Sequence, residues 1–259
     1  MPRPIPRILL NVLMGGALVR LLTLGAHSLW LDEGATWSWA TLPTWKDTLF
    51  AEANHPPVWW LVTRGWVSVF GDSESALRAP AALLGILLIW LAYRLGLRLL
   101  DPSEHPRRGG FDFAGDPGRR RRAALWFAGF VAASTYFVEY AQEARMYALL
   151  MVEAVGLSLL YLRWLDKGDR LSLIGYALLA ALALHTQYFA LWPIAAHGAH
   201  ALFLFARTRG SKDAVAPWPF LGAIAVAGAL FLPWFLWMLT AYEGISTGDP
   251  FDPFSRLAY

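Results

Sequence analysis

Three side chains that could carry acid–base chemistry lie in one polar stretch of an otherwise apolar chain: Asp32, Glu33 and His55. A carboxylate pair with a histidine can act as a general base or hold a divalent metal ion. The structural alternative is that the acids cap the N-terminus of a helix and the histidine only packs. Capping needs only one of the two acids, however, and His55 directly precedes residues 56–57, a Pro-Pro pair that restricts the backbone.

The composition places these residues in a membrane protein. The chain is 57% hydrophobic and only 16% charged, with a mean hydropathy of +0.41. Soluble domains have about 45–50% apolar and about 25% charged residues. Cysteine is absent, which excludes disulfides, cysteine-zinc sites and thiol nucleophiles. The net charge of +3 is small and no long basic tract occurs, so a nucleic-acid partner is not expected.

The apolar segments predict an all-α integral membrane protein. A helix that crosses the hydrocarbon needs about 20 mostly apolar residues, and lipid cannot satisfy the backbone polar groups of an open strand. About seven segments meet this length. They lie near 5–24, 77–100, 123–140, 146–165, 171–187, 189–206 and 216–240.

Basic residues predict the orientation of these spans, because cytoplasmic loops carry an excess of Lys and Arg. Arg3 and Arg7 place the N-terminus in the cytoplasm, and the arginine-rich loop 101–122 lies on the same side. The intervening loops carry acids instead. The prediction is a multi-pass protein of the inner (plasma) membrane, with its acidic loops on the outer or periplasmic side.

The first outer loop, residues 25–76, contains half of the chain's 14 tryptophans. Its apolar segment 58–70 would cover only about 20 Å as a helix, whereas the hydrocarbon core is about 30 Å thick. We therefore predict two interfacial helices, near 33–42 and 57–70, since tryptophan prefers the headgroup level. An aromatic anchor without chemistry is the alternative.

Five motifs, in this order and spacing, resemble one family. They are SLWLDE at 28–33, HPP at 55–57, FGDSESALRAP at 70–80, YAQEARMYAL at 140–149 and FLPW at 231–234. Together they resemble the dolichyl-phosphate-mannose protein mannosyltransferase-like family of the bacterial family 39 type, which includes the RgtA/B/C/D-like glycosyltransferases and aminoarabinose transferases. The resemblance covers nearly all of the chain.

This resemblance implies a GT-C architecture in which residues 1–259 form one transmembrane domain, the N-terminal part of a longer family pattern or a short variant of it. It implies an enzyme that transfers a sugar, with inversion, from a polyprenyl-phosphate donor to a hydroxyl acceptor at the outer face. The matching acid of the family makes Asp32 the expected catalytic base, with Glu33 beside it.

Further roles follow as hypotheses from the same chemistry. Arg145 and Arg78 are the candidates for binding the donor phosphate, because the guanidinium is a permanently charged planar fork. Trp59, Trp60 and Tyr147 are the candidates for lining a groove for the lipid. The alternatives are that Arg145 pairs with a nearby acid, that Arg78 marks a helix end, and that the aromatic residues only pack.

A divalent metal ion held by His55 and Glu143 is one prediction for the cofactor, and a metal-free site is the other, since relatives differ in metal use. The sugar and the acceptor are not predicted. Two other functions stay open: a small transporter or flippase-like protein, and a non-catalytic scaffold partner of a longer glycosyltransferase.

Overall fold

The computed structural model describes residues 7–100, 117–209 and 216–246, and every regular element in these ranges is helical. The helices are α1 (Arg7–Leu21), α2 (Leu31–Ala40), α3 (Trp45–Leu49), α4 (Val58–Phe70), α5 (Glu74–Leu99), α6 (Pro117–Ala133), α7 (Thr135–Glu139), α8 (Tyr147–Lys167), α9 (Arg170–Thr186), the short 3-10 helix η2 (Tyr188–Ala190), α10 (Leu191–Thr208) and α11 (Trp218–Ser246).

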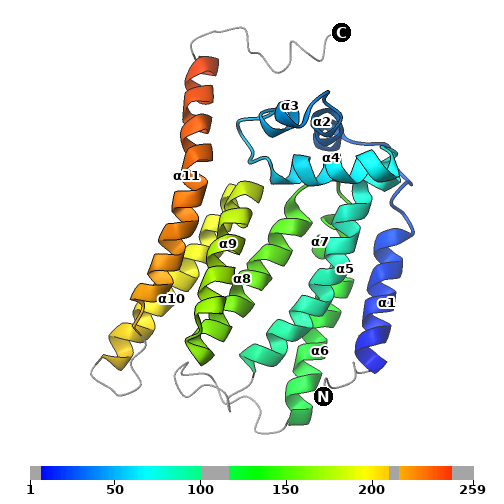
Figure 1. The fold of residues 1–259 in the computed structure, drawn as a ribbon. Coiled ribbons are helices and arrows are strands. Elements are labelled where there is room, and N and C mark those ends of the chain that lie inside the picture. Colours follow the sequence, from blue (N-terminus) through cyan, green and yellow to red (C-terminus); the bar gives the residue numbers. More distant parts are fainter. Residues whose placement is uncertain (1–6, 101–116, 210–215, 247–259) are drawn as a thin grey trace.

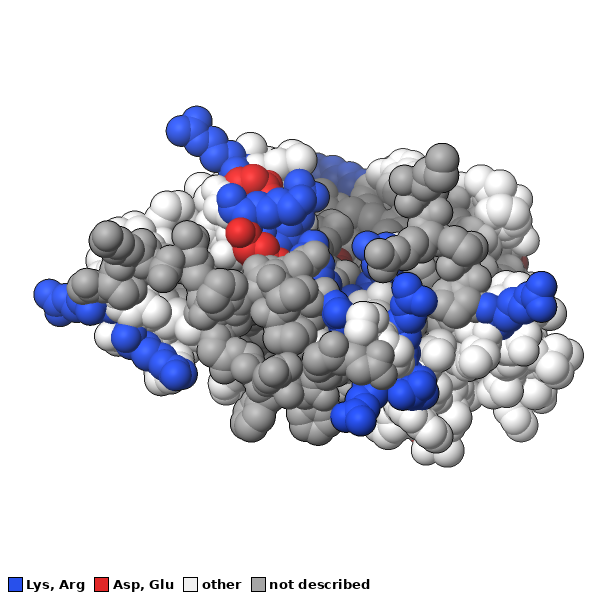
Figure 2. All heavy atoms as spheres, turned by 90° about the horizontal axis from the view of Figure 1, so that it is seen from below, with Lys and Arg blue, Asp and Glu red and all other residues white. Residues whose placement is uncertain are grey.

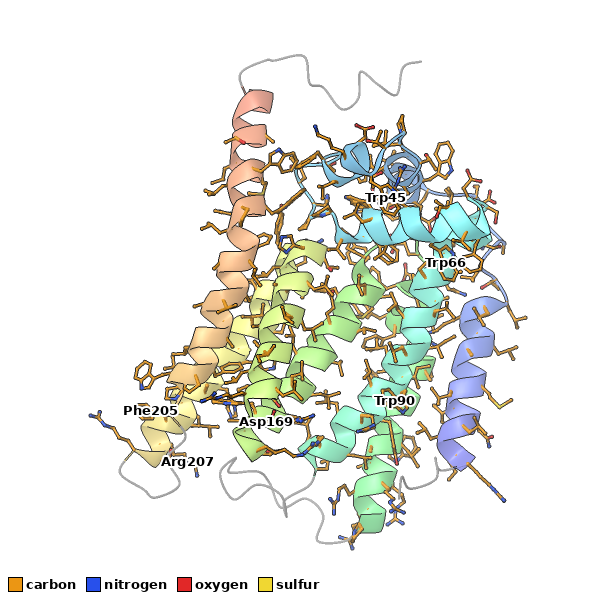
Figure 3. All side chains as sticks on the ribbon, viewed as in Figure 1. Trp45, Trp66, Trp90, Asp169, Phe205 and Arg207 are labelled. Carbon is orange, nitrogen blue, oxygen red and sulfur yellow. The ribbon has the colours of Figure 1, made fainter. Side chains whose placement is uncertain are left out.

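The long helices form a bundle, and α2, α3 and α4 lie across one end of it as a cap (Figure 1). α5 packs against α6 and α8, and α9 lies between α8 and α11. The cap rests on the bundle through contacts of α4 with α5 and α9. Trp45 and Trp66 lie in the cap, at the opposite end from Asp169 and Arg207 (Figure 3).

The prediction of an all-α membrane protein is confirmed at this coarse level. Among the described residues, four helices are long and apolar enough to cross a membrane: Glu74–Leu99, Tyr147–Lys167, Tyr188–Thr208 and Trp218–Ala241. α9 is apolar but shorter, and α1 and α6 have only 15 and 17 residues. The predicted helices near 33–42 and 57–70 correspond to α2 and α4, while α3 was not predicted.

Local signals fix the ends of the cap helices. The Thr44 hydroxyl accepts the backbone N–H of Asp47, and the Asp47 carboxylate accepts that of Thr44, which begins α3 with a capping box. α4 begins after Pro57 and ends at Gly71, whose φ of 80° is accessible to glycine at no steric cost. The chain can therefore turn sharply from the cap into α5.

A buried arginine holds α1 to the break between α6 and α7. Arg20 is fully buried, and its guanidinium donates to the carbonyl oxygens of Val131 (2.8 Å) and Ala132 (3.1 Å) at the end of α6. It also donates to the carbonyls of Gly16 (3.1 Å) and Phe137 (3.4 Å). Carbonyls at a helix C-terminus are unsatisfied and carry partial negative charge, so a cation here stabilises the break.

We expect Arg20→Met to destabilise the protein by at least about 2 kcal/mol, because each buried carbonyl that loses its partner costs about 1–3 kcal/mol. Thermal unfolding in detergent measures the effect, with Arg7→Met at the exposed start of α1 as the control. Equal melting temperatures for the two variants would contradict the role given to Arg20.

Candidate functional site

The centre of the cap is a buried ion pair between Glu33 in the first turn of α2 and Arg78 in α5. Arg78 Nε donates to Glu33 Oε1 at 2.7 Å, and Nη2 donates to Oε2 at 2.6 Å. The remaining Arg78 donors reach the carbonyl oxygens of Leu24, His27 and Ser28, at 2.7, 2.8 and 3.2 Å. A guanidinium has five N–H groups, so all of them are used.

Glu33 also ties the second outer loop to this pair. Its Oε1 accepts the backbone N–H of Ala144 at 2.8 Å, and its side chain is only 1% exposed. Burial alone would raise the pKa of Glu33, but the bonds from Arg78, Ala144 and Trp30 outweigh burial and lower it. Glu33 is thus an ionised group that joins α2, α5 and the segment before α8.

The ion pair brings Asp32 and Arg145 together. Asp32 directly precedes Glu33, and Arg145 directly follows Ala144, whose backbone N–H Glu33 binds. Arg145 Nη2 lies 3.7 Å from Asp32 Oδ2, and Nη1 lies 3.5 Å from the Asp32 carbonyl oxygen. The Asp32 side chain is 39% exposed, whereas that of Arg145 is 4% exposed. Asp32 is therefore open to solvent above a nearly buried cation.

Three buried nitrogen atoms around Arg145 have no hydrogen-bond partner: Arg145 Nε, Trp60 Nε1 and His55 Nδ1. The Arg145 guanidinium lies over the Trp60 indole, 5.4 Å from the ring centroid, and the His55 ring lies 6.4 Å from it. Arginine and tryptophan can only donate hydrogen bonds. Two unpaired donors beside one positive charge favour an anionic ligand with acceptor oxygens.

Burial shifts the pKa values of His55 and Glu143, and the charge of Arg145 acts on both. Burial lowers the pKa of His55, and the positive charge of Arg145 lowers it further, so the imidazole is neutral at neutral pH. Burial raises the pKa of Glu143 to about 7, although Arg145 opposes this. The neighbouring acids Glu33 and Asp32 contribute to the rise.

The predicted groove residues lie beneath the site. Trp59 and Trp60 are fully buried in one cluster with Met146, against which Tyr147 packs. Trp59 Nε1 donates to the Ala144 carbonyl oxygen at 3.1 Å. These two tryptophans therefore form the packed floor of the site, and their surfaces are not exposed in this structure.

The structure thus gathers Asp32, Glu33, Arg78 and Arg145 into one network, with His55 beside Arg145. Arg78 has no N–H left for a phosphate, and Glu33 has no oxygen free of hydrogen bonds. Within the described ranges, no group of three or more His, Cys, Asp or Glu side chains could hold a metal ion. The predicted metal pair of His55 and Glu143 has no third such ligand among the described residues.

Gln142 is a further positioning residue that the sequence did not single out. Its amide donates to Thr23 Oγ1 at 2.6 Å and to the Val19 carbonyl at 3.0 Å, which anchors the segment before Arg145 to the end of α1. The only signal in the sequence was its place in the YAQEARMYAL motif.

Comparisons with known protein families, curated proteins and solved structures found no match to this chain.

We expect Glu33→Gln to destabilise the protein by about 3–5 kcal/mol, because it leaves Arg78 buried without its counter-charge. Since the pKa of Glu33 is lowered by folding, the wild-type pair is intact at neutral pH and is lost as the pH falls through that pKa. Urea or thermal unfolding from neutral to acidic pH should show this loss in the wild type and not in Glu33→Gln.

Exposed Glu74 on α5 provides the matched control, Glu74→Gln, which should cost less than about 1 kcal/mol, the size of an exposed charge in the first turn of a helix. The double variant Glu33→Leu with Arg78→Met should be more stable than the sum of the single effects predicts, because it leaves no orphaned charge. Strict additivity would mean that the two side chains do not act as a pair.

Proposed function

We propose that this chain is a membrane glycosyltransferase that moves a sugar from a polyprenyl-phosphate donor to a hydroxyl acceptor at the outer face of the membrane, with inversion. One observation carries the proposal: the nearly buried Arg145, with an unpaired Nε, lies directly beneath the exposed carboxylate of Asp32. A cation for a phosphate and a base for a hydroxyl are therefore adjacent.

The charge distribution supports the orientation. The end of the bundle opposite the cap is seen from below in Figure 2, where Lys and Arg side chains of the described residues outnumber the acidic ones. The helix ends at this side of the bundle include Arg7, Arg98, Arg119, Arg120, Arg121, Arg122, Arg163, Lys167, Arg170, Arg207 and Arg209. Cytoplasmic faces carry such an excess, which leaves the cap outside. In this arrangement α1, α6 and α9 join the four long helices to make seven spans in a GT-C architecture.

The chemistry follows from what each group can do. Asp32 takes the proton of the acceptor hydroxyl while its oxygen attacks the anomeric carbon. The bond from that carbon to the phosphate oxygen breaks on the opposite face, which inverts the configuration. The polyprenyl phosphate leaves with the bonding electrons, and Arg145 stabilises its negative charge.

The same geometry changes the roles expected of Arg78, Glu33, Trp59 and Trp60. We assign Arg78 to holding Glu33 and Glu33 to positioning Asp32 and Ala144, since both side chains are saturated with partners. We assign Trp59 and Trp60 to supporting the site from below, with Tyr147 at its edge. The motif FGDSESALRAP then serves mainly to assemble the site, whereas YAQEARMYAL also supplies Arg145 to it.

We expect Asp32→Asn to abolish sugar transfer while the protein inserts and folds normally, because asparagine keeps the size of the side chain but cannot act as a base. The assay uses membranes with a panel of radiolabelled polyprenyl-phosphate sugars. Transfer at the wild-type rate would remove Asp32 from the mechanism. Absence of transfer by the wild type with every donor would instead favour the transporter-like or scaffold function.

Glu143 should make donor binding depend on pH. Its pKa of about 7 means that a negative charge appears near Arg145 as the pH rises through neutrality. The affinity for a polyprenyl-phosphate sugar, a phosphodiester whose single negative charge does not change in this range, should therefore fall between about pH 6 and pH 8 when it is measured by titration of the protein in detergent. Glu143→Gln should flatten this dependence, and an unchanged dependence in that variant would exclude Glu143 as its source.

A further inference from the structure

A second carboxyl group lies inside the bundle, away from the site at the cap. Glu153, in the second turn of α8, is only 2% exposed. Its Oε1 lies 2.9 Å from Thr186 Oγ1 on α9, while its buried Oε2 has no partner. No described Lys or Arg is within ion-pair distance of Glu153. An ionised carboxylate in such a place would lack almost all compensation for its lost hydration.

The hydrogen bonds of Thr186 indicate where the proton is. Its hydroxyl oxygen lies 2.9 Å from Glu153 Oε1 and 3.1 Å from the Leu182 carbonyl oxygen. A hydroxyl has one proton, and a carbonyl oxygen can only accept. Both contacts are hydrogen bonds if Thr186 donates to Leu182 and a protonated Glu153 donates to Thr186. An ionised Glu153 would compete with the carbonyl for the same proton.

Other proton-carrying groups continue along the same face of α8. Tyr161 lies eight residues beyond Glu153, about two helical turns lower on that face. Its hydroxyl contacts His200 Nδ1 at 2.8 Å. Between them, His197 contacts Tyr176 at 3.0 Å through Nδ1 and Ser158 at 3.2 Å through Nε2. We call these hydroxyl and imidazole groups the α8 polar seam, which no hydrogen bond of the described residues joins to Glu153 or Thr186.

We propose that Glu153 is a proton-binding site inside the bundle, occupied at neutral pH. Carboxyl groups inside a membrane bundle are groups that bind and release protons in membrane proteins. On release, the proton of Oε1 passes to water and a carboxylate remains in the bundle. This inference is independent of the proposed transferase activity, because it uses none of the residues at the cap.

The other ionisable groups on the helices packed against α8 are engaged elsewhere. On α9, His185 Nδ1 contacts the Ala181 carbonyl and its ring packs on Phe231. On α10, the imidazoles belong to the lower part of the seam. On α5, the arginines have other partners: Arg78 with Glu33, Arg94 with the Trp90 ring and Arg98 with Asp166. None of these contacts supplies a counter-charge to Glu153.

Infrared spectroscopy of the full chain in lipid nanodiscs tests the proposal without a substrate. The wild type at neutral pH should show a carbonyl stretch of a protonated carboxyl group that is absent from Glu153→Gln. Thr186→Val should shift this band to higher frequency, because the acid loses its hydrogen-bond acceptor. Transfer to D2O should shift the band to lower frequency as the proton exchanges.

Glutamine has nearly the size of a protonated glutamic acid, so Glu153→Gln should fold, and circular dichroism checks this. Glu74→Gln, at an exposed acid, is the matched control and should leave the band unchanged. Identical spectra for the wild type and Glu153→Gln would mean that Glu153 is ionised and would overturn the proposal. A band that stays unshifted in D2O would show that the Glu153 proton does not exchange with solvent. Glu153 would then be a buried acid without a proton-binding role, which would overturn the proposal.

Discussion

The arrangement of the cap depends on the buried ion pair between Glu33 and Arg78. A pair of this kind contributes little net stability when compared with well-packed apolar residues, because both charges lose their hydration. Its effect here is positional. Arg78 is rigidly held in α5 and fixes Glu33, and Glu33 in turn binds the backbone of Ala144. The outer residues Asp32 and Arg145 are placed next to each other because their immediate neighbours cannot move.

Burial then divides the chemistry between groups of the same type. Glu33 and Asp32 are adjacent carboxylates, yet one has every oxygen satisfied and the other is open to solvent. Arg78 and Arg145 differ in the same way, since one has used all five donors and the other keeps an unpaired Nε. A saturated group can only hold the site together. An unsaturated group beside it is available to a ligand, because its lost hydration has not been replaced by the protein.

The sequence predicts much of this fold, because the physical constraints on a membrane helix are strong. Helix positions follow from apolar length, and the ends of the cap helix α4 follow from Pro57 and Gly71. The sequence also predicts which stretches carry the site. It does not predict the pairing of Glu33 with Arg78, which lie 45 residues apart. Both were expected to act on the substrate, since a residue type shows which chemistry a side chain can do but not whether a neighbour already occupies it.

For the same reason, the sequence alone does not predict a role for Glu153. A single acid inside an apolar segment can face lipid, pair with a distant arginine or remain protonated, and only the packed neighbours distinguish these states. Thr186 does so here, because its one proton has two acceptors within reach unless Glu153 supplies a second proton. Comparing the number of available protons with the number of hydrogen-bond acceptors therefore identifies protonation states that helix positions and charge patterns cannot predict. It separates a cap site, where a cation keeps an unpaired N–H, from a bundle interior in which an acid retains its proton.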